Sequence, residues 1–206
     1  MDYTNHPHLE FRRKFFKIVG AEITVSDSDT NETVGFIKMK AFKLKEDVRL
    51  YADASMDTEL LIIKARSIID FGATYDVTDP MNGELICSLR RKGLRSTFVR
   101  DKWEILNSGG DVIGMILETS GALAIVRRYV GAINELLELV FAFVPETFRV
   151  VALADGTEVQ TATVVHRKNP LVVKMTMDAS MRPSTVDPRI NVAATTMLAI
   201  IDANKN

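Results

Sequence analysis

The last stretch of the chain constrains the fold more than any other. Residues 188–204 read PRINVAATTMLAIIDAN, which is apolar or small on almost every side. Asp187 is a suitable N-cap residue, and Pro188 fits the first position of a helix. A helix without a polar face must be surrounded by protein, and this one is shorter than the roughly 20 residues that a bilayer requires. The sequence therefore predicts a helix over residues 187–204 at the centre of the core, with the rest of the chain wrapped around it.

Upstream of this helix the sequence repeats one unit: a strand, a polar turn and a return strand. The turns contain Gly or Asn, the residues that best tolerate the positive φ of tight turns. Four hairpins are expected, with strands over 22–26 and 34–42, 75–79 and 83–89, 103–107 and 110–116, and 148–155 and 156–162. Further strands are predicted over 48–52, 60–69 and 171–177. Because such a meander must bury its inner face, the expected fold is mainly β: a closed antiparallel barrel around the central C-terminal helix.

One extra amphipathic helix is predicted around residues 128–144, where apolar side chains recur at helical spacing until Pro145 ends the pattern. Its apolar stripe either packs on the barrel wall or forms an interface. In the second case Leu136, Val140 and Phe141 would contact a protein partner, a second copy of the chain or a membrane surface. The sequence leaves both alternatives open.

Composition excludes several classes of protein. The 206 residues contain no linker or charge block that divides them, so residues 1–206 are expected to form one domain with a ragged N-terminus over 1–10. Lys+Arg 26 against Asp+Glu 27 gives no global field that favours nucleic acid. A single cysteine and no apolar leader indicate a cytoplasmic protein without a transmembrane span, with attachment to a membrane surface as the open alternative.

Two features carry a resemblance to a known family. One is the hairpin series, with YDVTD (75–79) and Gly83, then RRK (90–92) and DKWEIL (101–106); the other is the Asp-initiated apolar helix. In both, the chain resembles the LURP-one-related proteins, which belong to the tubby C-terminal-like superfamily with the phospholipid scramblases. The resemblance covers roughly residues 21–202 and implies a closed β-barrel with a hydrophobic helix through its middle. The cysteine cluster and acidic calcium-like loop of the scramblases are missing.

The best candidate for anion binding is a basic cluster in the middle of the chain. It comprises Arg90, Arg91, Lys92, Arg95, Arg100 and Lys102. The resemblance implies a role for it, since tubby-like domains bind phosphoinositide head groups through Lys and Arg on the outer face of the barrel. Several such side chains could clamp a phosphate with charge-assisted hydrogen bonds. The alternative is a solvated strand end that keeps a sheet edge from pairing.

No catalytic, cofactor-binding or metal-binding residues are predicted. The three histidines, His6, His8 and His166, do not have a spacing that pairs them with a nucleophile or with metal ligands. His166 is expected at the surface, in a turn. Cys87 lies in a predicted strand and is expected to be a small buried hydrophobic residue. The segment DSDTN (27–31) begins like a calcium loop but lacks its later Gly and Glu, so a hairpin turn is expected there.

The preferred functional hypothesis is a non-enzymatic binding domain. It would engage an anionic, phosphoinositide-like head group or a protein partner through a basic patch on the outer wall, and no cofactor is expected. One alternative is a structural protein that assembles, as a homo-oligomer or otherwise, through the 128–144 helix. The least favoured alternatives are a scramblase-like protein and a protein that binds a small ligand beside the central helix.

Overall fold

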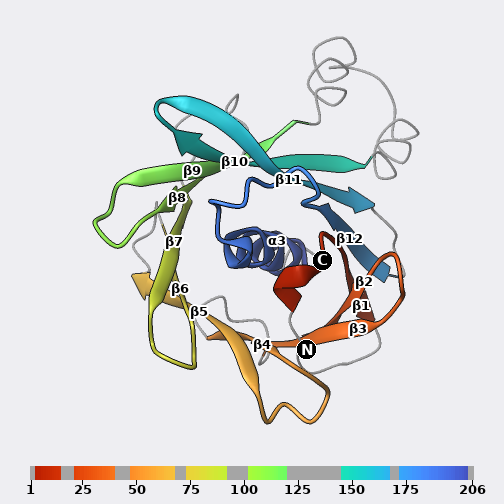
Figure 1. Cartoon of the computed structure of the whole chain (residues 1–206). Coiled ribbons are helices and arrows are strands. Elements are labelled where there is room, and N and C mark those ends of the chain that lie inside the picture. The colour runs from red at the N-terminus through yellow and green to blue at the C-terminus, as the bar shows by residue number, and fades with distance from the viewer. Residues whose placement is uncertain are drawn as a thin grey trace, which may run out of the picture.

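The computed structural model describes residues 3–14, 21–39, 47–67, 73–91, 102–119, 145–167 and 172–203. These residues form a closed antiparallel barrel with a helix through its centre, as Figure 1 shows in a view along the barrel axis. The strands are β1 (His8–Lys14), β2 (Ala21–Asp27), β3 (Thr33–Met39), β4 (Val48–Tyr51), β5 (Glu59–Ser67), β6 (Thr74–Thr78), β7 (Leu85–Arg91), β8 (Lys102–Leu106), β9 (Val112–Glu118), β10 (Glu146–Ala154), β11 (Thr157–Arg167) and β12 (Val172–Asp178). Each strand pairs with its neighbours in sequence, and β1 pairs with β12 to close the barrel.

The four predicted hairpins are confirmed as the pairs β2–β3, β6–β7, β8–β9 and β10–β11. Their turns place Gly or Asn in the left-handed region, with φ of 62° at Asn31, 72° at Gly83, 88° at Gly110 and 78° at Gly156. Asp155 precedes Gly156 with φ 50°, which is the backbone of a tight two-residue turn. Turn chemistry therefore fixed the register of these hairpins locally.

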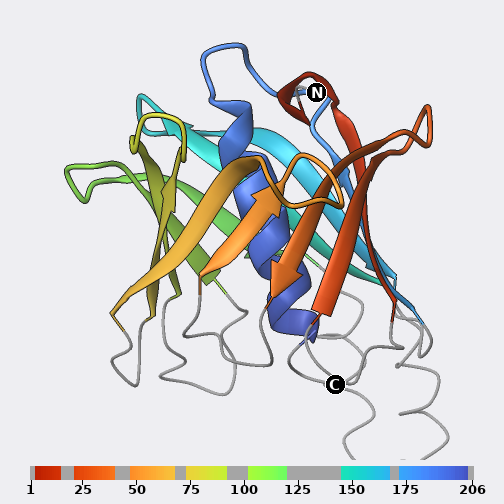
Figure 2. The same ribbon diagram turned by 90° about the horizontal axis from the view of Figure 1, so that it is seen from below.

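The central helix is α3 (Pro188–Ala203), within one residue of the prediction at each end. The Asp187 side chain accepts a hydrogen bond from Arg189 N at 2.9 Å, which is the expected N-cap contact. Residues 191–200 are all buried, and Figure 2 shows α3 running lengthwise inside the strands. The few polar side chains of the helix have specific positions: Asn191 exchanges hydrogen bonds with Thr161 of β11, and Thr195 donates to Asn191 O.

The start of the chain differs from the ragged segment expected over residues 1–10. Residues 3–5 form a short 3-10 helix, η1 (Tyr3–Asn5), and β1 begins at His8. Tyr3 is only 5% exposed, and Ala179 N donates to Pro7 O. This strand was not predicted because the alternation of apolar Leu9 and Phe11 with charged residues is short. In addition, its partner β12 lies at the far end of the chain.

The helix predicted around 128–144 lies outside the described residues, together with Leu136, Val140 and Phe141. Strands β5 and β12 each differ from their predicted bounds by one or two residues.

Candidate functional site

The barrel has two chemically different ends. Because neighbouring strands are antiparallel, the turns 28–32, 52–58, 79–84, 107–111 and 155–156 all lie at the end where α3 begins. We call this the acidic end, because the described charged residues there include only two arginines, Arg182 and Arg189, besides the carboxylates. The carboxylates are Asp27, Asp29, Glu32, Asp53, Asp57, Glu59, Asp79, Glu84, Asp111, Asp155, Glu158, Asp178 and Asp187.

The opposite end, where α3 finishes, is the basic end. Its described basic residues outnumber its carboxylates, which are Glu10, Glu22, Asp47, Asp76, Glu104, Glu118 and Glu146. The basic residues are Arg12, Arg13, Lys38, Arg49, Lys64, Arg66, Arg90, Arg91, Arg149, Arg167 and Lys174. The dipole of α3 is opposite to this charge separation and therefore complements it: its positive N-terminus lies at the acidic end and its negative C-terminus at the basic end. The net charge of −1 for the whole chain hides this separation.

Two members of the predicted basic cluster lie at the basic end in the described part of the chain. Arg90 donates to Glu104 Oε2 from Nε at 3.0 Å and from Nη2 at 2.6 Å, and the Glu104 side chain is only 6% exposed. The Arg91 guanidinium carbon lies 6.0 Å from the centre of the Trp103 ring, within reach of a cation–π contact. Arg90 therefore compensates the charge of a buried carboxylate, whereas Arg91 lies beside the Trp103 ring.

The other members of the cluster are less fully described. Lys102 opens β8 on the strand next to Arg91, so the two ends of the 90–102 segment meet at one rim of the barrel. Lys92, Arg95 and Arg100 lie outside the described residues. The structure thus places the cluster's flanks at the basic end, and the anion-binding role of the cluster remains a prediction.

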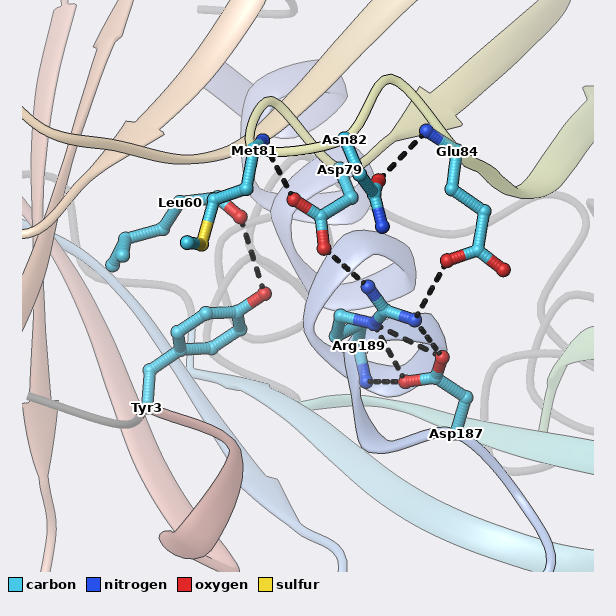
Figure 3. Close-up of polar contacts among 8 residues, drawn as sticks. All are labelled: Tyr3, Leu60, Asp79, Met81, Asn82, Glu84, Asp187 and Arg189. Atoms are coloured by element: carbon cyan, nitrogen blue, oxygen red, sulfur yellow. Dashed lines mark hydrogen bonds and ion pairs between the residues drawn. The ribbon is translucent and has the colours of Figure 1, made fainter.

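At the acidic end, Arg189 ties the start of α3 to the β6–β7 turn (Figure 3). Its Nη1 lies 2.7 Å from Asp79 Oδ2, and its Nη2 lies 2.6 Å from Asp187 Oδ2. The hydrogen bonds that Arg189 donates to the Asp187 carboxylate raise the pKa of Arg189. Burial opposes the ionised form of Asp187, but Arg189 lowers the pKa of this carboxyl overall. Sequence analysis missed this contact, since 110 residues separate Arg189 from Asp79.

Beside the start of α3 the acidic end holds a cavity of about 350 Å³. Its walls come from η1, from the end of β12 with the loop that follows, and from the first turn of α3. The lining residues are Tyr3, Thr4, Asn5, His6, Pro7, Met177, Ala179, Ser180, Arg182, Pro188, Asn191 and Val192. This volume is at the lower end of the range for small-molecule sites. A small ligand beside the central helix, one of the least favoured alternatives from the sequence, therefore has a candidate position.

Two histidines connect the N-terminal segment beside this cavity to Asp27 and Asp29. His6 Nδ1 lies 2.5 Å from Asp27 Oδ2, and His8 Nδ1 lies 2.7 Å from Asp29 Oδ2. Hydrogen bonds from Thr30 N and from His6 lower the pKa of Asp27 to about 2. The hydrogen bond to Asp29 raises the pKa of His8 above its usual value. Asp27 also accepts from Asp29 N, as expected of a hairpin turn.

The other reactive side chains considered from the sequence, Cys87 and His166, are buried in the barrel. Cys87 is fully buried, as predicted, and burial raises its pKa to about 12, which keeps the thiol protonated. The prediction of a surface position for His166 is wrong, because this residue, the last but one of β11, is buried and only 3% exposed. Its Nδ1 lies 3.6 Å from Glu146 Oε2 on the neighbouring strand. Among the described residues, no three or more His, Cys, Asp or Glu side chains are placed to hold a metal ion.

Comparison with known proteins gives one match. The sequence model of the LURP-one-related family matches residues 33–201, which is most of the chain. Neither a curated protein nor a solved structure matches. In the described part of the structure, no helix combines the length and apolar character needed to cross a membrane. With its closed barrel threaded by a C-terminal hydrophobic helix, the chain belongs to the LURP-one-related family.

Proposed function

We propose that this chain is a non-enzymatic binding domain that attaches to anionic phospholipid head groups through the basic end of its barrel. The separation of charge along the barrel axis is the observation that carries the proposal. An anionic membrane surface attracts basic residues that lie within about a Debye length, roughly 8 Å at physiological ionic strength. A molecule with one basic and one acidic end would approach such a surface in one orientation.

Other features support a binder rather than a catalyst. Residues 191–200 fill the barrel with mostly apolar side chains. Of the polar ones, Asn191 and Thr195 make hydrogen bonds within the core, and Thr196 is buried there. The family and the fold fit a tubby-like binding domain. Of the basic cluster, Arg90, Arg91 and Lys102 belong to strand ends at the end of the barrel where the proposed contact would form.

Vesicle co-sedimentation tests the proposal with phosphatidylcholine vesicles, with and without phosphatidylserine. We expect binding only to the anionic vesicles, with a loss of affinity as salt is raised. The variant Lys92→Gln/Arg95→Gln/Arg100→Gln should weaken binding several-fold. The exposed pair Arg12→Gln/Arg167→Gln should do so to a smaller extent. Arg90 is left intact, because its removal would leave Glu104 buried without a counter-charge.

The matched control changes the net charge equally at the other end. The variant Thr58→Glu/Met81→Glu/Met181→Glu adds three negative charges to exposed positions of the acidic end. It should bind anionic vesicles almost as well as the wild-type protein. Equal losses in both triple variants, or binding to neutral vesicles alone, would contradict a contact through the basic end. A protein partner at this end, the alternative hypothesis, would then be sought by crosslinking from position 92.

A further inference from the structure

The cavity at the acidic end has a lining that is unusual for its surroundings. Carboxylates crowd this end of the barrel, yet the described residues that line the cavity include no Asp or Glu. The polar lining consists of hydroxyls, amides, one histidine and one arginine, and the apolar lining consists of Pro7, Met177, Ala179, Pro188 and Val192. A small organic molecule with hydroxyls would find both kinds of contact here.

The nearest carboxylates are already engaged by other groups. Asp27 accepts from His6 and from two backbone amides, and Asp178 accepts from Ser180 N. Asp187 caps α3 and binds Arg189. Protein donors therefore already occupy oxygens of these three carboxylates.

Two side chains of the lining, Arg182 and His6, can donate hydrogen bonds to an anion. Arg182 uses Nη1 to hold the loop after β12, donating to Val186 O at 2.5 Å and Pro183 O at 3.3 Å. Its Nε and Nη2 make no hydrogen bond within the described residues, and a guanidinium presents these two groups as a fork suited to an oxyanion. His6 also lines the cavity and contacts Asp27 through Nδ1, so this contact does not use its Nε2.

We propose that this cavity binds a small organic molecule with a single oxyanion group, a carboxylate or a phosphate monoester, held by Arg182 with His6 beside it. The carboxylates of the acidic end oppose a highly charged ligand, which favours a single carboxylate or phosphate monoester over a polyphosphate. The site lies at the other end of the barrel from the proposed membrane contact and does not depend on it.

Nuclear magnetic resonance titration of the ¹⁵N-labelled full chain tests the proposal with three probes at constant ionic strength. The probes are lactate, glycerol 3-phosphate and, as the uncharged control, glycerol. We expect saturable shifts of the amides of Thr4–His6, Ser180–Arg182 and Asn191–Val192 with at least one of the acids and none with glycerol. The acid that binds identifies the oxyanion.

Two variants locate the site. Arg182→Gln should weaken binding about tenfold, the loss of one charge-assisted hydrogen bond, whereas Arg149→Gln on the exposed wall should not change it. Because Arg182 also holds its loop, Ala179→Leu provides a second variant that fills the cavity and leaves every polar group in place. Its control is Ala154→Leu, at an exposed position away from the cavity. Absence of saturable shifts up to about 10 mM of both acids, or unchanged binding by Ala179→Leu, would overturn the proposal.

Discussion

At the scale of single residues, the close approach of β9 to β10 depends on Gly114. A Cβ at this position would lie 2.5 Å from Val151 O and 3.3 Å from Ile105 Cδ1. The backbone oxygen cannot move without shifting the strand pair. We therefore expect Gly114→Ala to lower the free energy of unfolding by about 1–3 kcal/mol, the usual effect of overpacking, in a urea titration. Gly109→Ala is the control, since its Cβ would meet only side-chain atoms at 3.2 Å or more, and an equal loss there would contradict this explanation.

His8 gives the stability of the acidic end a pH dependence. Its pKa is raised by the hydrogen bond to Asp29, with Asp178 and Asp27 also facing it. A raised pKa in the folded state means that the protonated form stabilises the fold. This contribution is fully present below the unfolded value of about 6.5 and is lost as the pH rises through the folded value.

We therefore expect the melting temperature of the wild-type protein to fall between about pH 6 and pH 8 by more than that of His8→Gln. Asp29→Asn, which removes the partner, should flatten the profile in the same way. Identical slopes for the wild-type protein and both variants, measured by circular dichroism, would show that His8 is not the group responsible.

At the scale of elements, Arg189 couples α3 to the barrel wall. Its side chain is 24% exposed and that of Asp79 is 19% exposed, so the ion pair is only partly screened by solvent. In a double-mutant cycle with Arg189→Met and Asp79→Asn we expect a coupling of about 0.5–3 kcal/mol. The exposed pair Arg66–Asp76 is the comparison, because Arg66 is 52% exposed and such pairs contribute about 1 kcal/mol or less. A coupling at Arg189 no larger than at Arg66 would mean that the contact does not anchor the helix.

Within the helix, the apolar pattern of the sequence does not predict how deeply each apolar residue is buried. The sequence treats Leu198 and Ile201 as equally central, but Ile201 is only half-buried, whereas Leu198 is 7% exposed and Ile200 is 1% exposed. Ile200→Ala and Leu198→Ala should each cost roughly 2–5 kcal/mol, and Ile201→Ala should cost less. Chemical denaturation of the three variants gives the order directly. A larger loss for Ile201→Ala would contradict the observed burial.

At the scale of the whole molecule, the barrel and its helix form one core. The inward side chains of the twelve strands pack against α3, so a chain that ends before Asp187 would expose their apolar faces to water. We expect the 1–186 variant to aggregate or to unfold without a cooperative transition, in sedimentation and thermal melts. Adding a peptide of residues 187–206 should restore solubility in part. A soluble, cooperatively folded 1–186 variant would show that the strands form a core without the helix.

The sequence by itself determined the features that depend on neighbouring residues. Asp187 and Pro188 set the start of α3, and Asn31, Gly83, Gly110 and Gly156 set the hairpin turns, because capping and positive φ are local properties. The burial of Cys87 and of the C-terminal helix was also predicted, because the apolar character of a segment can be read from its own residues. The resemblance to the LURP-one-related proteins also rests on these local features, the series of hairpins and the C-terminal helix.

Only the tertiary structure decided what depends on strands that meet from distant parts of the chain. It paired β1 with β12, buried His166, joined Arg189 to Asp79 and enclosed the cavity between η1 and α3. It also collected the acidic turns at one end and the basic strand ends at the other, although the two charges alternate along the sequence. The physical reason is closure: antiparallel strands bring every second connection to the same end, and no short window of sequence contains that information.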